Sequence, residues 1–132
     1  MRIFVCASKH MYGKLPPVIA ALESRGHVVT LPNSYYDPLK EEVMKTVGAV
    51  DHALWKGEML RAQKVKVAAN DAVLVMNFEK NGVPNYIGGA TFLEVYMAFD
   101  LGKPVYLWNP LPDGSLQDEL RGMRVQVIDG DL

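Results

Sequence analysis

The chain has 132 residues, and a single domain typically takes roughly 100–200. Apolar residues make up 49% of it, and the 14 Lys and Arg nearly balance the 15 Asp and Glu. This balance excludes an extended basic surface for nucleic acid, and no apolar segment approaches the roughly 20 residues of a membrane span. The N-terminal apolar stretch is too short for a signal peptide. We therefore expect one cytoplasmic domain over residues 1–132, with no nucleic-acid or membrane partner.

The N-terminal third predicts a strand, a helix and a second strand. Arg2–Ala7 is predicted to be a short buried strand because Ile3–Ala7 is continuously apolar; it contains the only cysteine, Cys6, which we expect to be a small buried side chain. After the loop Ser8–Gly13, two prolines open a helix of roughly ten residues, because proline is tolerated in the first turn. His27–Leu31 then alternates weakly and is predicted to be the second strand.

The stretch from Pro38 to Asn70 is predicted to be mostly helical. Apolar residues recur there at helical spacing, and Gly48 with Asp51 predicts a break between two helices. The clearest strand follows at Ala72–Met76, where five apolar residues without alternation indicate cover on both faces. The helical spacing is carried by Val43, Val47, Val50 and Leu54.

The remaining chain predicts two more strands and two helices. A loop from Asn77 to Gly89 leads to a helix over about Ala90–Leu101. The last elements are a strand at Pro104–Trp108, a short helix at Ser115–Leu120 and a strand at Val125–Ile128. Strands separated by helices imply right-handed crossovers and a parallel sheet. We therefore expect an α/β fold: a single-domain, flavodoxin-like (Rossmann-like) three-layer sandwich with a five-stranded parallel sheet.

Ligands of such sheets bind beyond the carboxyl ends of the strands. This rule directs attention to the loops Ser8–Gly13, Asn77–Gly89 and Asn109–Gly114. The helix after the second of these loops is apolar nearly all round, which predicts that it is buried. Glu94 lies on that helix, and a buried carboxylate needs a partner or a function.

Two interpretations of Glu94 stay open at this point. Thr91 and Glu94 match a capping box, with Thr91 as the N-cap, which would make Glu94 purely structural. Alternatively, a carboxylate in the first turn of the helix is kept ionised by the helix dipole and can act as a nucleophile. Gly88 and Gly89 would then let the backbone approach a ligand closely, with free N–H groups to hold it.

Three segments together resemble the nucleoside 2-deoxyribosyltransferase family, which includes nucleoside 5′-monophosphate N-glycosidases. They are Asn70–Asn77, then Asn85–Glu94 containing Gly88-Gly89, then Ala98 with Leu101-Gly102-Lys103-Pro104-Val105. The family pattern is an Asp leading into the third strand, a Gly-rich loop, a Glu in the next helix and a Gly-Lys-Pro entry to the fourth strand. The detailed match covers about 35 residues.

The resemblance implies that Glu94 attacks the anomeric carbon of a nucleoside and forms a glycosyl-enzyme ester, with overall retention. The expected reaction is 2-deoxyribosyl transfer between bases. The alternatives are hydrolysis of (deoxy)nucleoside 5′-monophosphates and a non-catalytic nucleotide-binding module. A phosphoribohydrolase of the cytokinin-activating type is a further, looser match. Asp71 is implied as the second catalytic residue, although Asn70-Asp71 equally fits a simple turn into the strand.

The substrate-binding candidates all come from the loops that follow predicted strands. Lys9 and His10 are candidates for a 5′-phosphate, and Asn109 for the sugar or base. Trp55 can line a base pocket by stacking, although packing in the core or an interface explains it better. The full set of substrate-binding candidates is Ser8, Lys9, His10, Tyr12, Asn77, Tyr86, Gly88, Gly89, Thr91 and Asn109.

The sequence departs from the family pattern in the first strand. Phe4 occupies the position of the family tyrosine that hydrogen-bonds the nucleophile, so Tyr12 or Tyr86 would have to substitute. Gly88 also replaces a serine of the hydrolases, six residues before the nucleophile. No metal or cofactor is expected. The resemblance further implies a homo-oligomer with sites near the subunit interfaces and a small-molecule nucleoside or nucleotide as partner.

Overall fold

The computed structural model describes residues 1–132 and contains one five-stranded, all-parallel sheet of order β2-β1-β3-β4-β5. The strands pair in parallel at every step, for example Phe4 with Val73 between the central two. This is the strand order of flavodoxin-like sheets, and it confirms the predicted fold class. The strands are β1 (Arg2–Cys6), β2 (Val28–Thr30), β3 (Ala72–Val75), β4 (Val105–Leu107) and β5 (Gln126–Val127).

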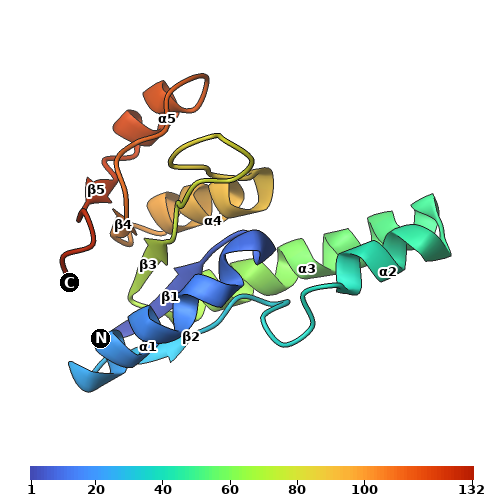
Figure 1. The fold of residues 1–132 in the computed structure, drawn as a ribbon, viewed down its shortest axis with the longest axis horizontal. Coiled ribbons are helices and arrows are strands. Elements are labelled where there is room, and N and C mark those ends of the chain that lie inside the picture. Colours follow the sequence, from blue (N-terminus) through green and yellow to red (C-terminus); the bar gives the residue numbers. More distant parts are fainter.

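Alternate residues of the central strands face opposite layers of helices (Figure 1). Ile3 and Val5 of β1 pack with α1 (Leu15–Ser24), whereas Phe4 and Cys6 face the layer that contains α3 (Ala49–Ala69) and α4 (Gly89–Asp100). Both faces of β3 are buried in this way, as its unbroken apolar run predicts. The short helices are η1 (Lys9–Lys14), α2 (Lys40–Val47) and α5 (Gln117–Gly122).

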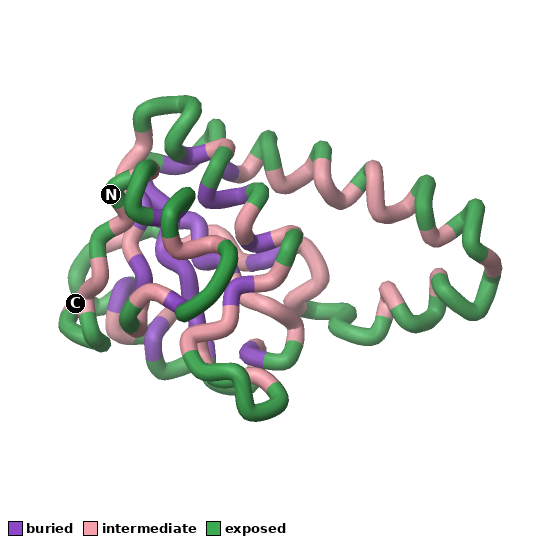
Figure 2. The backbone as a smooth tube through the Cα atoms, turned by 90° about the horizontal axis from the view of Figure 1, so that it is seen from above, coloured by how far each residue is buried: buried purple, intermediate pink, exposed green.

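Helix α2 and the N-terminal part of α3 form an arm that extends away from the sheet, whereas the C-terminal part of α3 packs on it (Figures 1 and 2). Gly48 separates the two helices at a φ of 153°, a conformation that favours glycine, so the predicted break lies there. The arm reaches beyond the body of the domain, so the apolar stripe on these helices does not face a core. The stripe residues Val43, Val47, Val50 and Leu54 are 51–74% exposed.

Helix α4 is buried on one side only, which corrects the expectation of burial nearly all round. The buried side carries Thr91, Glu94, Val95 and Ala98. The outer side carries large apolar residues that are 41–53% exposed, namely Leu93, Tyr96, Phe99 and Leu101. The usual distribution is therefore partly inverted: a carboxyl group points inward while aromatic side chains face outward. No helix is both long and apolar enough to cross a membrane.

Candidate active site

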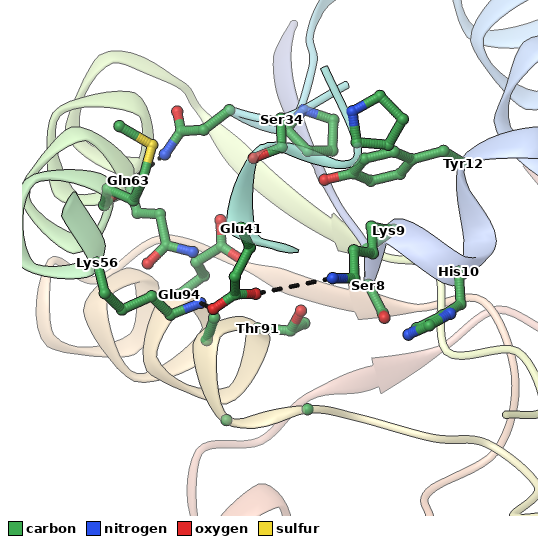
Figure 3. A pocket seen from close by; sticks show the side chains of 18 of the residues that line it. Ser8, Lys9, His10, Tyr12, Ser34, Glu41, Lys56, Gln63, Thr91 and Glu94 are labelled. Carbon is green, nitrogen blue, oxygen red and sulfur yellow. Dashed lines mark hydrogen bonds and ion pairs between the residues drawn. The ribbon is translucent and has the colours of Figure 1, made fainter. Parts of the chain in front are cut away.

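A cavity of about 370 Å³ lies beyond the carboxyl end of β1, between the start of α4 and the α2–α3 arm. Its walls come from the loops after β1, β2 and β3, from one side of α2, from the inner side of α3 and from the N-terminal half of α4. Figure 3 shows the side chains that converge on it. The cavity brings together these predicted residues: Ser8, Lys9, His10, Tyr12, Tyr86, Gly88, Gly89, Thr91 and Glu94.

Glu94 lies at the inner end of this cavity and is only 4% exposed. Burial raises the pKa of its carboxyl group from 4.5 to about 8, against the opposing effects of the Cys6 thiol and of two lysines, Lys66 and Lys56. The prediction of a buried charge-bearing group is therefore confirmed. The helix dipole was expected to keep this group ionised, but burial instead raises its pKa to about 8 and favours the protonated form at neutral pH.

The start of α4 rules out the capping-box interpretation. The N-cap residue is Gly88, and Thr91 and Glu94 are the third and sixth residues of the helix that begins at Gly89. No side chain caps this helix. The helix dipole acts most strongly in the first turn, and Glu94 lies beyond it. Burial is therefore the main influence on the pKa of Glu94. Glu94 therefore does not take part in a capping box.

Gly88 and Gly89 have different environments at the edge of the cavity. A Cβ atom on Gly88 would lie 3.3 Å from the Tyr86 hydroxyl and 3.4 Å from its ring, tighter than an ordinary contact. A Cβ atom on Gly89 would meet no protein atom within 4 Å, and neither glycine has a positive φ. The close approach of Tyr86 explains why a glycine occupies position 88. Beside Gly89 there is only open space.

A cluster of ion pairs joins the loop after β1 to the arm across the cavity (Figure 3). Glu41 is its centre, with His52 Nε2 at 3.0 Å, Lys56 Nζ at 3.3 Å and Lys9 Nζ at 3.9 Å. Burial would raise the pKa of Glu41, but His52 and Lys56 together hold it below its usual value. Lys9 also pairs with Glu42. Lys9 therefore lies at the site as predicted but already has two carboxylate partners.

Two tyrosines, Tyr12 and Tyr86, line the cavity. Burial raises the pKa of Tyr12 to about 12, and the nearby Glu94 contributes to the shift. Phe4 itself is fully buried in the core, with Lys66 Nζ 5.8 Å from the centre of its ring. Tyr12 is thus the tyrosine whose titration is coupled to that of Glu94.

Asp71 does not reach the cavity, in contrast to the role that the resemblance implies for it. It lies before β3, at the amino edge of the sheet, and accepts hydrogen bonds from the Arg2 backbone N–H (2.7 Å) and guanidinium (3.1 Å). These two bonds hold the pKa of Asp71 below its usual value. The cavity lies at the opposite, carboxyl edge, because the strands are parallel. The position of Asp71 therefore agrees with the other interpretation, in which Asn70-Asp71 forms a turn into β3.

Asn77 and Asn109 also lie outside the cavity wall. The buried Asn77 side chain accepts a hydrogen bond from the Asn109 N–H at 2.8 Å and donates to the carbonyl groups of Asn109 and Pro110, each at 3.0 Å. The Asn109 side chain donates back to the Asn77 carbonyl at 3.1 Å. These hydrogen bonds join the chain segments that follow β3 and β4, so Asn77 and Asn109 have a structural role here.

The sequence did not predict that α3 forms a wall of the cavity. The one exception is Trp55, which was a candidate for lining a base pocket. Trp55, Met59 and Gln63 are spaced by four residues, so they form one stripe that faces the cavity. The spacing was visible in the sequence, but nothing there indicates which side of a long, weakly amphipathic helix faces a ligand. No group of three or more His, Cys, Asp or Glu side chains is arranged to hold a metal ion.

Comparison with known proteins finds similarity at the level of fold. No protein-family model and no curated protein sequence matches the chain. Among solved structures, the CMP N-glycosidase BcmB of Clostridium botulinum matches with a TM-score of 0.57 and 15% sequence identity. The match covers 97% of this chain and 88% of the other. At this identity the likeness establishes a shared fold.

Proposed function

We propose that this protein breaks the N-glycosidic bond of a nucleoside or nucleotide, with Glu94 as the nucleophile. The observation that carries the proposal is a single buried carboxyl group at the inner end of a cavity at the carboxyl edge of the sheet. The resemblance around Gly88-Gly89 and Glu94 supports it, as does the shared fold with a CMP N-glycosidase. The N-cap of the helix is Gly88, so the carboxyl group does not act in a capping box.

The proposed reaction proceeds in two steps with retention. The Glu94 carboxylate attacks the anomeric carbon, the bond from that carbon to the base nitrogen breaks, and the base leaves with the electron pair. The base takes up one proton, which balances the proton that Glu94 loses when it ionises from its pKa of about 8. Water then hydrolyses the ester in a hydrolase, whereas the nitrogen of a second base attacks it in a transferase.

The first turn of α4 and the loop after β1 are the proposed binding elements for the sugar or its phosphate. The turn begins without a side-chain cap, so its free N–H groups are available to a polar or anionic group. The carboxylates of Glu41 and Glu42 already neutralise Lys9, so a 5′-phosphate would have to displace them. The exposed His10 has no such partner and is the better phosphate candidate.

Chromatographic detection of released base tests the proposal. The purified protein is incubated with each common nucleoside, deoxynucleoside and 5′-monophosphate, with and without a second free base. Base release without an acceptor identifies hydrolysis, and a new nucleoside in its presence identifies transfer. Glu94→Gln should abolish both, whereas the exposed α3 residue Glu58 provides a matched control in Glu58→Gln. Nucleotide binding without any base release by the wild type would instead identify a non-catalytic module.

A homo-oligomer is part of the proposal because α4 leaves apolar side chains exposed beside the site. Tyr96 and Phe99 are 53% and 47% exposed on the side of the helix opposite Glu94. Association of copies would cover this surface. Sedimentation velocity of the wild type and of Tyr96→Lys distinguishes the cases: dissociation by the substitution supports the proposal, and a monomeric wild type contradicts it.

A further inference from the structure

One buried polar atom has no partner, and it belongs to a residue that lines the cavity. Among buried side-chain nitrogen and oxygen atoms, only Oε1 of Gln63 lacks a hydrogen bond. Leaving a buried acceptor unpaired typically costs about 1–3 kcal/mol. Gln63 lies on α3 and contributes to the lining of the cavity, near Glu94 (Figure 3). An unpaired buried group in a folded protein calls for an explanation, and a partner that arrives with a ligand would supply one here.

The neighbours of Gln63 on the same helix form a surface suited to a flat ring. Met59 lies one turn before it and Trp55 two turns before it, and both line the cavity. The Asn33 side chain donates a hydrogen bond of 3.0 Å to the Met59 carbonyl, which ties the loop after β2 to this stretch of α3. Trp55 stacks against His52 at 6.1 Å. A thioether, an indole and an amide thus follow one another along one wall.

We propose that this stripe of α3 is the base-binding wall of the site and that Gln63 selects bases with an exocyclic amino group, cytosine or adenine. The inference rests on the proposed function. A glutamine amide presents an acceptor beside a donor, which complements an amino group next to a ring nitrogen. The unpaired atom in the structure is the acceptor, which matches the amino hydrogens once the half-buried Gln63 side chain turns it toward the cavity.

Bases with an oxo group at the same position fit the wall less well. Uracil and hypoxanthine present an acceptor where cytosine and adenine present a donor. The Gln63 amide would have to turn over to meet them, which would place its NH₂ group in the buried position that Oε1 now holds. The buried position would then hold the two donor hydrogens of the NH₂ group in place of one acceptor oxygen. Gln63 therefore discriminates the two classes through the cost of leaving polar groups unpaired.

The test compares kcat/KM for cytidine with uridine 5′-monophosphate and for adenosine with inosine 5′-monophosphate, together with the matching nucleosides. We expect the wild type to prefer the amino member of the pair it accepts by on the order of tenfold. Gln63→Met keeps a side chain of similar length without the amide, and should bring the ratio close to one. Lys64→Met, on the exposed side of the same helix, should leave the ratio unchanged. An oxo preference in the wild type, or an unchanged ratio in Gln63→Met, overturns the inference while the proposed function stands.

Two further measurements keep the inference separate from folding and from the proposed function. Removal of an unpaired buried acceptor should leave the thermal midpoint of Gln63→Met equal to or above that of the wild type, so lost selectivity cannot be ascribed to unfolding. If the wild type releases no base from any substrate, the proposed function fails. Calorimetric titration with free cytosine and free uracil then decides the inference: tighter cytosine binding that Gln63→Met abolishes supports it, and equal binding rejects it.

Discussion

The Lys56 Nζ lies 3.3 Å from Oε2 of Glu41, and its positive charge also acts on the buried carboxyl group of Glu94. Lys56 therefore links the ion-pair cluster of the arm to the proposed nucleophile. The relationship has a chemical consequence, because Glu94 must ionise before it can attack and a nearby cation favours the ionised form.

Removal of Lys56 should make Glu94 harder to ionise. In Lys56→Met, we expect the pKa of Glu94 to rise above its value of about 8, because one of the two lysine charges that lower it is lost. The profile of kcat/KM against pH should rise with increasing pH in both proteins, with its midpoint displaced to higher pH in the variant. Lys64→Met, on the exposed side of α3, is the control. An unchanged midpoint would contradict the link.

The raised pKa of Glu94 also predicts how stability depends on pH. The folded state holds a proton on Glu94 up to about pH 8, whereas the unfolded chain releases it near 4.5. The unfolded state thus binds fewer protons between these values, so this group makes the free energy of unfolding fall as pH rises across that window. Urea melts at several pH values should show a shallower decline in Glu94→Gln and a more stable variant near pH 8. Parallel curves for the two proteins would show that Glu94 is not buried as described.

Asp71→Asn should leave the reaction nearly intact. Asp71 pairs with Arg2 at the amino edge of the sheet, whereas the cavity opens at the carboxyl edge. We expect a small loss of thermal stability and a kcat within about twofold of the wild type, since exposed ion pairs contribute little. The measurement is base release beside a thermal melt. A loss of kcat as large as that in Glu94→Gln would restore Asp71 to a catalytic role.

Gly88 and Gly89 should respond differently to alanine. In Gly88→Ala the new Cβ presses on the Tyr86 ring, so we expect lower stability as well as lower activity. In Gly89→Ala the new Cβ meets only the open cavity and alanine favours the helix, so stability should be kept or increased. A higher KM in Gly89→Ala would show that substrate occupies this space. Unchanged kinetics would show that the ligand lies elsewhere.

Most of the fold could be predicted from the sequence because its signals are local. The unbroken apolar run Ala72–Met76 requires cover on both faces, and Gly48 interrupts a helical pattern, so β3 and the α2–α3 break followed directly. The direction of the arm could not be predicted. Its stripe of valines has the spacing of a core-facing helix, and only tertiary structure shows that it remains exposed.

The candidate site was predicted in part, for physical reasons. Gly88, Gly89 and Glu94 are close in sequence, so one motif locates them together. Gln63 and Lys56 come from a distant helix whose rotation no local pattern fixes. The charge state of Glu94 depends on burial by elements across the sheet, and the sequence alone indicated the opposite state. Asp71 precedes its strand, and in a parallel sheet that order places it at the edge away from the ligand.

Mass spectrometry of the protein quenched during turnover tests the central claim most directly. If Glu94 is the nucleophile, the intact mass should increase by one sugar or sugar-phosphate residue, and peptide mapping should locate the ester on Glu94. Glu94→Gln, incubated identically, should remain unmodified. Base release by the wild type with no adduct on Glu94 under any quench, or with equal turnover by Glu94→Gln, would contradict the account.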